Sequence, residues 1–316
     1  MLRASFVCFV VVFCFVAACL CDPVPDMTPK SERNAAARNT YYITSYAGGA
    51  NANNVPVENS IDGVAALGYL DGTQTVTIVV HGRDSSAFSD FAFEIRNAIV
   101  ATELNSAVIV VDWSAIAGSG YNQARALVPQ VAQDLSNFIV LLEAGQRLNR
   151  NLLHIIGFDL GAHVAGITSR ITASRARKIT ALSPAGVGWD IRSQRLLSSD
   201  AQLVEVIHTD AVGGGAFGMV VTERVGSLDF FPNGGTRQPG CSNNDNACHH
   251  NRAWQLFVAT VQMGGHLTGT RCDTLVQALN NRCTAFGTAV MGTNVQTKLA
   301  QGMYALTTGR AFPYTA

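Results

Sequence analysis

The sequence predicts an α/β protein whose central sheet is mostly parallel and carries helices on both faces. Short apolar runs rich in β-branched residues alternate with amphipathic helical patterns, as parallel strands and their crossover helices do. The predicted strands are Gln74–Val80, Ala107–Asp112, Leu152–Ile156, Lys178–Leu182 and Leu203–Ile207. Apolar residues recur every three or four positions over Asn122–Gly145, which predicts a helix. We expect a single domain over residues 41–316, because no repeat or linker interrupts the pattern.

Composition and charge narrow the range of partners. Of the 316 residues, 48% are hydrophobic, which is enough for a sizeable core. The 22 basic and 22 acidic side chains cancel to a net charge near zero. Electrostatic attraction to nucleic acid or to an anionic membrane is therefore not expected.

The N-terminus has the pattern of a secretory signal peptide over residues 1–21. Arg3 precedes an apolar run from Phe6 to Leu20. A membrane anchor is the alternative, but the run is short for a span, which needs ~20 apolar residues. Residues 22–40 are expected to form a mobile N-terminus before a first strand at Tyr41–Ser45. We expect the mature protein to be secreted and extracellular.

Four cysteines follow the predicted signal peptide: Cys241, Cys248, Cys272 and Cys283. In an oxidising compartment the local disulfides Cys241–Cys248 and Cys272–Cys283 are the simplest assignment, although four cysteines allow three connectivities. The chain contains no CxxC spacing, and we expect no metal and no cofactor.

The segment Gly157–Gly161 reads GFDLG and lies between a β-branched strand and a helical pattern. A strand, a G-x-nucleophile-x-G turn and a helix together form the nucleophile elbow of α/β-hydrolases. The turn lifts its central residue, here Asp159, above the sheet. The N–H of Leu160 then points from the helix N-terminus towards a reacting oxygen.

Residues 157–166, GFDLGAHVAG, resemble the GHSLGAHVAG of the neutral, pancreatic-type lipase family. Six further segments resemble family patterns in the same order: HGR at 81–83, VIVVDWS at 108–114, ALSPAG at 181–186, SDAQLVEVIHTD at 199–210, GSLDFFPNGGTRQPGC at 226–241 and CHHNRA at 248–253. The resemblance covers nearly the whole predicted mature chain. It implies a single α/β-hydrolase domain.

Carried over residue by residue, the resemblance places the family's catalytic serine at Asp159, its acid at Ser183 and its histidine at His250. It places the two oxyanion donors on the N–H groups of Arg83 and Leu160. Two of the three triad side chains therefore differ from the family pattern.

An ionised aspartate has no proton to give, and its charge opposes the oxyanion of ester hydrolysis. We therefore predict a pseudoenzyme in which Asp159, His250 and Ser183 form a structural network. The family includes lipase-related yolk proteins that lack the nucleophile. This likeness favours a lipid- or small-ligand-binding, storage or carrier role.

Three catalytic alternatives remain open. In the first, Asp159 attacks an alkyl carbon, as in epoxide hydrolases and haloalkane dehalogenases, and His250 activates water with Asp210 as a possible acid. In the second, Ser183 is the nucleophile and Asp159 orients His250. In the third, the oxyanion hole and His250 retain weak carboxylic-ester lipase or phospholipase A1 activity.

Six residues, five of them polar, separate Cys241 from Cys248, where lipases carry a lid. This short loop resembles that of phospholipase A1 members and predicts an open site. The end of the chain at residue 316 implies no C-terminal β-sandwich and no colipase-type partner. The oligomeric state is left open. Five other histidines are predicted to be structural: His81, His154, His163, His208 and His249.

Overall fold

The computed structural model describes residues 39–46, 52–172, 175–190, 192–211, 218 and 223–316. The predicted signal peptide, and the predicted mobile segment as far as residue 38, lie outside the described residues. Among the described helices none is long and apolar enough to cross a membrane.

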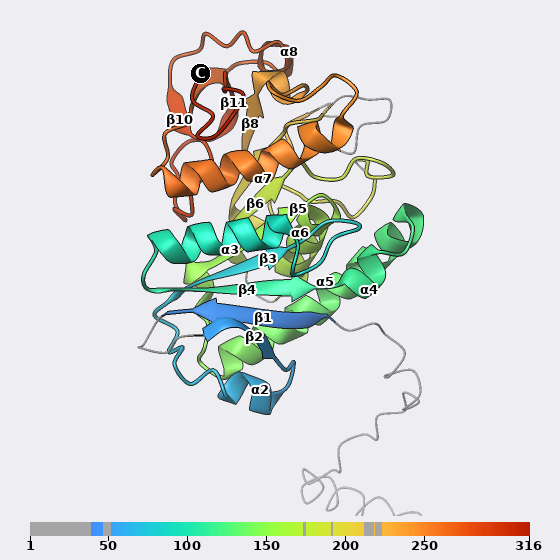
Figure 1. The fold of residues 1–316 in the computed structure, drawn as a ribbon, viewed down its shortest axis with the longest axis vertical. Helices are drawn as coiled ribbons and strands as arrows, with labels where there is room; N and C mark the ends of the chain where they lie inside the picture. Colours follow the sequence, from blue (N-terminus) through green and yellow to red (C-terminus); the bar gives the residue numbers. More distant parts are fainter. Residues whose placement is uncertain (1–38, 47–51, 173–174, 191, 212–217, 219–222) are drawn as a thin grey trace, which may run out of the picture. The chain divides into compact units, whose positions relative to one another are not determined.

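The described chain forms one eleven-stranded sheet flanked by helices (Figure 1). The strands are β1 (Thr40–Ser45), β2 (Ala52–Val57), β3 (Thr75–Val80), β4 (Ser106–Asp112), β5 (Leu153–Phe158), β6 (Ala176–Leu182), β7 (Ala201–Ile207), β8 (Leu228–Pro232), β9 (Thr268–Cys272), β10 (Thr288–Val290) and β11 (Gly302–Leu306). The helices are α2 (Ile61–Ala65), α3 (Asp90–Thr102), α4 (Ser114–Ala117), α5 (Tyr121–Ala144), α6 (Leu160–Ile171), α7 (Asn246–Gln262) and α8 (Leu275–Leu279), with short 3-10 turns η3 (Arg150–Leu152) and η4 (Asn233–Gly235).

The strand order is β10-β9-β11-β8-β7-β6-β5-β3-β4-β1-β2. The central strands from β4 to β11 are parallel to their neighbours. Antiparallel pairs complete both edges. The predicted α/β-hydrolase class with a mostly parallel sheet is therefore confirmed.

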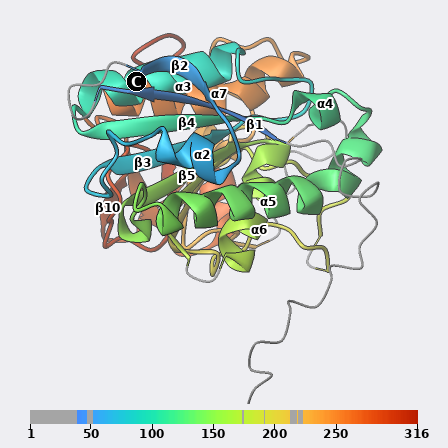
Figure 2. The same ribbon diagram turned by 90° about the horizontal axis from the view of Figure 1, so that it is seen from below.

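Helices cover both faces of the sheet, with α5 and α6 on one side and α3 and α7 on the other (Figure 2). Strand β5 shows the reason, because its neighbouring residues Ile155 and Ile156 are both fully buried and belong to opposite cores. Apolar side chains on both faces of a strand require a covering layer on each side. The near-continuous apolar runs of the sequence thus lead directly to the three-layer arrangement.

The five central strands predicted from the sequence appear as β3 to β7, with ends shifted by at most two residues, and the predicted helix appears as α5. Strands β2, β8, β9, β10 and β11 were not expected. They are short, and β9 (TGTRC) has little apolar content, with only two of its five residues buried. Such strands form because they pair with neighbouring strands, and their own sequences carry no clear strand pattern of apolar residues.

The candidate site residues gather at the carboxyl edge of the parallel strands. Arg83 follows β3, Asp159 follows β5, Ser183 follows β6 and Asp210 follows β7. In open parallel sheets this edge is where ligands bind. The topology therefore brings together residues that are more than 120 positions apart in the sequence.

Substitution Gly157→Ala should destabilise the fold at the turn that carries Asp159. A Cβ atom at position 157 would lie 2.3 Å from the carbonyl oxygen of Gly161, and the surrounding backbone has no room to yield. We expect the free energy of unfolding, measured by urea denaturation, to fall by roughly 1–3 kcal/mol. Gly68→Ala is the matched control, because its nearest atom would lie at 3.8 Å. Equal effects of the two substitutions would contradict this explanation.

Candidate active site

Asp159 occupies a strained turn between β5 and α6. Its backbone angles, φ 55° and ψ −120°, are unusual for a residue other than glycine. The turn is held by close packing, since a Cβ at Gly161 would lie 2.3 Å from the carbonyl oxygen of Val80. The neighbouring strand and helix thus keep Asp159 at the top of the sheet, as the elbow pattern predicts.

One of the two predicted oxyanion donors binds the Asp159 carboxylate itself. The backbone N–H of Arg83 donates to Oδ2 at 2.9 Å. The N–H of Leu160 also favours the ionised form and helps to lower the pKa of this carboxyl. The structure therefore brings Arg83, Leu160 and Asp159 together, with a carboxylate oxygen in the place that a substrate oxyanion would take.

His250 lies on α7 between two carboxylates. Its Nε2 is 3.5 Å from Oδ1 of Asp159, and its Nδ1 is 2.8 Å from Oδ2 of Asp210. Burial disfavours the charged imidazolium, but the charges of Asp210 and Asp159 outweigh burial and raise the pKa of His250 to about 9. Burial likewise works against ionised Asp159, yet His250 and the two backbone donors lower the pKa of this carboxyl. The pair is therefore ionised at neutral pH.

Ser183 does not supply the group that orients His250 from Nδ1, although the resemblance places the acid there. Its hydroxyl donates to Oδ1 of Asp210 at 2.8 Å and also lies 2.9 Å from Oγ1 of Thr209. The second oxygen of Asp210 accepts from the N–H of Gly218 at 2.7 Å and faces His250. The expected network thus contains a fourth member, Asp210, between Ser183 and His250.

The sequence signal for Asp210 is its position directly after a buried strand, at the same sheet edge as the elbow. The aspartate-nucleophile alternative already names it as a possible acid. Serine at position 183 has a short side chain and no charge, so it cannot replace a carboxylate beside His250. It instead satisfies one oxygen of a buried carboxylate, which would be costly to leave without a partner.

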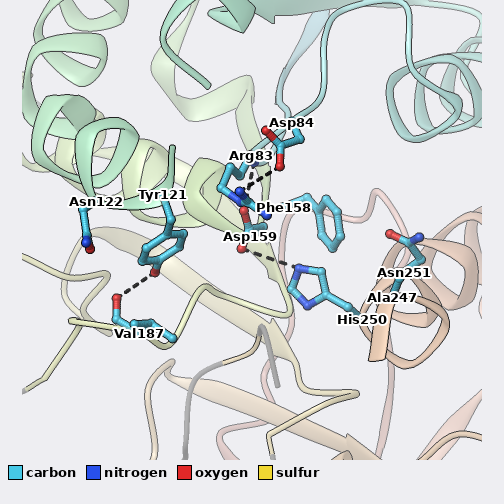
Figure 3. Close-up of a pocket in the computed structure, with 10 residues that line it drawn as sticks. All are labelled: Arg83, Asp84, Tyr121, Asn122, Phe158, Asp159, Val187, Ala247, His250 and Asn251. Carbon is cyan, nitrogen blue, oxygen red and sulfur yellow. Dashed lines mark hydrogen bonds and ion pairs between the residues drawn. The ribbon is translucent and has the colours of Figure 1, made fainter. Parts of the chain in front are cut away.

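A cavity of about 550 Å³ opens beside Asp159 and His250 (Figure 3). Its lining consists of Arg83, Asp84, Tyr121, Asn122, Phe158, Asp159, Val187, Ala247, His250 and Asn251. The hydroxyl of Tyr121 donates to the carbonyl of Val187 at 2.7 Å. Burial and the charge of Asp159 raise the pKa of Tyr121 to about 12, so it is neutral. No pattern in the sequence marked Tyr121 or Val187 as wall residues, because they meet only in the folded chain.

Both predicted disulfides are present, Cys241–Cys248 and Cys272–Cys283. The first closes the short polar loop immediately before His250. Asp245 in this loop accepts the N–H of Cys248 and caps α7. The disulfide and the cap together fix the first turn of α7, which carries Ala247 and His250 to the cavity.

Two of the other histidines shape the site without facing it. His81 accepts the N–H of Trp113 at 3.2 Å and contacts the carbonyl of Gly82, so it supports the loop that leads to Arg83. His163 is held by the carbonyl of Ala185, and burial lowers its pKa to about 4. The other three, His154, His208 and His249, are also buried. These contacts agree with the predicted structural roles.

The raised pKa of His250 predicts a pH-dependent contribution to stability. A folded-state pKa of about 9 against an ordinary value of 6.5 gives stabilisation that is complete below pH 6.5 and lost as pH rises through 9. The difference in unfolding free energy between the natural protein and His250→Gln should therefore shrink by on the order of 3 kcal/mol over this range. Burial lowers the pKa of Lys178 to about 8, but this group is common to both proteins and cancels. A difference that stays constant with pH would contradict the charged histidine.

Comparison with known proteins places the chain in a family. The family model described as Lipase matches residues 42–314. The chain is 34% identical to lipase member H of Rattus norvegicus over 70% of its length, which covers 50% of that protein. It is 28% identical to lipoprotein lipase of Homo sapiens (80% of this chain, 59% of the relative) and 31% identical to pancreatic triacylglycerol lipase of Sus scrofa (65% and 50%). The chain spans about half the length of these relatives. The match over residues 42–314, on a sheet with the nucleophile elbow in place, shows that this chain belongs to the lipase family.

Proposed function

We propose that this protein does not hydrolyse carboxylic esters and instead binds an apolar small ligand, as a secreted storage or carrier protein. One observation carries the proposal: Oδ2 of Asp159 accepts the N–H of Arg83 at 2.9 Å, so the carboxylate uses a donor that the oxyanion hole would offer to a substrate.

The occupied hole blocks the serine-hydrolase mechanism at two steps. The nucleophile position offers no hydroxyl to attack an ester carbon, and the carbonyl oxygen of an ester finds the N–H of Arg83 already used. His250 is protonated at neutral pH and therefore cannot accept a proton as a general base. These features also argue against weak residual esterase activity, because the hole that would supply it is filled.

The cavity supports a binding role. Its volume of about 550 Å³ falls within the roughly 300–1,000 Å³ of small-molecule sites. Phe158, Tyr121, Val187 and Ala247 supply apolar and aromatic walls, and six polar or charged residues complete the lining. Binding to such walls removes apolar ligand surface from water, which is favourable without any chemical step.

Two features support secretion. The first 21 residues have the pattern of a cleaved signal peptide. The chain also carries two disulfides, which persist in oxidising compartments.

Substitution Asp159→Ser should create esterase activity. The new hydroxyl would face His250, which Asp210 already orients at 2.8 Å, and the N–H of Arg83 would be released. We expect hydrolysis of p-nitrophenyl butyrate at least about 100-fold faster than by the natural protein. Asp159→Asn is the matched control without a hydroxyl, and adding His250→Ala should remove the gain. Hydrolysis by the natural protein at the rate of Asp159→Ser would overturn the proposal.

Adding Ser183→Asp to this variant should reduce the gain rather than complete it. Ser183 Oγ lies 2.8 Å from Oδ1 of Asp210, so a second carboxylate would meet the first in a buried position. Like charges at this distance raise one carboxyl pKa strongly and destabilise the site. We expect lower kcat and lower thermal stability for the double variant than for Asp159→Ser alone. A higher kcat in the double variant would show that the residue at position 183, and not Asp210, is the acid that orients His250.

A second candidate function is hydrolysis with Asp159 as a covalent nucleophile, for example of an epoxide. It is favoured by the alignment of Asp159, His250 and Asp210. Oδ1 would attack the epoxide carbon, and the C–O bond would break with its electron pair on oxygen, which takes the proton of His250. Neutral His250 would then remove a proton from water, and the hydroxide would attack the ester carbonyl, whose oxygen faces the N–H groups of Arg83 and Leu160. The tetrahedral intermediate would break its bond to the product oxygen, which takes the proton back from His250 and leaves as the diol, and the Asp159 carboxylate would be restored.

This alternative leaves an isotopic signature. Because water attacks the carboxyl carbon, turnover of styrene oxide in ¹⁸O-water would place the heavy oxygen in the Asp159 side chain, visible by mass spectrometry of the peptide. We expect no turnover and no label. Turnover with labelled Asp159, lost in His250→Ala, would replace the carrier proposal by this enzyme.

A further inference from the structure

The cavity is lined by an ion pair whose two atoms are separated by more than the length of a short hydrogen bond. Oδ1 of Asp159 and Nε2 of His250 are separated by 3.5 Å, whereas charge-assisted hydrogen bonds measure about 2.7–2.9 Å. Both residues line the cavity, and Figure 3 shows the two groups facing each other beside Phe158.

Each member of the pair is fixed from behind. Oδ2 of Asp159 is held by the N–H of Arg83, and Nδ1 of His250 is held by Asp210 at 2.8 Å. A ligand therefore meets an acceptor, Oδ1, beside a donor, Nε2–H, whose positions change little on binding. Preorganised polar groups of this kind decide which head group an apolar site accepts.

A head group that fits this pair must donate one hydrogen bond and accept another. A carboxylate only accepts and is repelled by Asp159, and an ammonium group only donates and therefore offers Nε2–H of His250 no acceptor. An ether accepts but leaves Oδ1 without a donor. A hydroxyl does both, and an oxygen about 2.8 Å from each atom forms a triangle over a base of 3.5 Å.

We propose that the cavity selects an apolar alcohol, whose hydroxyl bridges Asp159 and His250. The inference rests on the proposed binding function and names the ligand class of the same site. The inference specifies the polar head group of the ligand only. The shape of its apolar part would be selected by the cavity walls.

The surroundings strengthen the selection. Asp159 and Asp210 carry two negative charges against the single positive charge of His250, so the cavity floor is net negative and disfavours fatty acids. The ring of Phe158 lies 4.6 Å from that of His250 and shields the pair from water. Low exposure of both side chains, 8% and 9%, makes hydrogen-bond mismatch at this point costly.

A ligand series with one tail tests the head group directly. Delipidated natural protein would be titrated calorimetrically with 1-tetradecanol, tetradecyl methyl ether, tetradecylamine and sodium tetradecanoate. We expect the alcohol to bind at least about tenfold more tightly than the ether and than either charged compound. This comparison needs no variant, so it holds even where a substitution disturbs folding.

A variant then assigns the preference to Asp159. Asp159→Asn keeps the shape, but with its oxygen in the oxyanion hole it presents an NH₂ donor to the ligand. The alcohol-over-ether ratio should fall to less than about threefold, and tetradecanoate should bind at least about tenfold more tightly than to the natural protein. Asp90→Asn removes the same charge from the exposed N-terminus of α3, away from the cavity lining, and should leave both ratios unchanged.

The outcomes separate the two proposals. Binding of the series without preference for the alcohol would overturn this inference and leave the carrier proposal in place. Equal changes in Asp159→Asn and Asp90→Asn would overturn the direct contact with Asp159. Failure of every compound to bind would overturn the binding function and this inference together.

Discussion

The candidate active site, at the carboxyl edge of the parallel strands, depends on a buried imidazolium that lies between two carboxylates. The charged ring of His250 faces Asp210 from Nδ1 and Asp159 from Nε2. Asp210 is satisfied by Ser183 and the N–H of Gly218. Buried charges are tolerated when they are paired and hydrogen-bonded, and breaking one partner leaves an expensive charge behind. The elbow, the loop after β3 and the ends of β6 and β7 all meet at this chain of contacts.

In a serine hydrolase the backbone donors of the oxyanion hole stabilise the transition state. In this chain the corresponding N–H of Arg83 binds a carboxylate of the protein itself. Donors aimed at the place where negative charge develops are useful to a transition state because that charge is transient. Here Asp159 brings a permanent negative charge to Arg83 and Leu160. The Arg83 donor thereby stabilises a charge of the folded protein, and the proposed ligand selection rests on the same contact. The strained turn that presents Asp159 persists because glycine contacts in β5 and α6 enforce it.

Access to the site follows from the short disulfide loop. Only six residues lie between Cys241 and Cys248, and the N-cap of α7 falls within them at Asp245. A loop of this length is committed to starting the helix and has no residues left to fold over the cavity. The cavity walls come instead from the start of α5 and from Val187, joined through the hydroxyl of Tyr121.

The sequence by itself determined the features that are local. The apolar runs predict β3 to β7 because each strand is buried on both faces, and the GFDLG turn predicts the elbow because only glycine allows its close packing. The cysteine spacing makes the two observed disulfides the simplest of three possible pairings, and the fold decides among them. The tertiary structure decided which carboxylate reaches His250. Ser183 and Asp210 follow adjacent strands at one sheet edge, so a linear sequence places both near the histidine. Whether Ser183 or Asp210 contacts His250 depends on the directions and lengths of their side chains. These positions are set only when strands far apart in the sequence pack together.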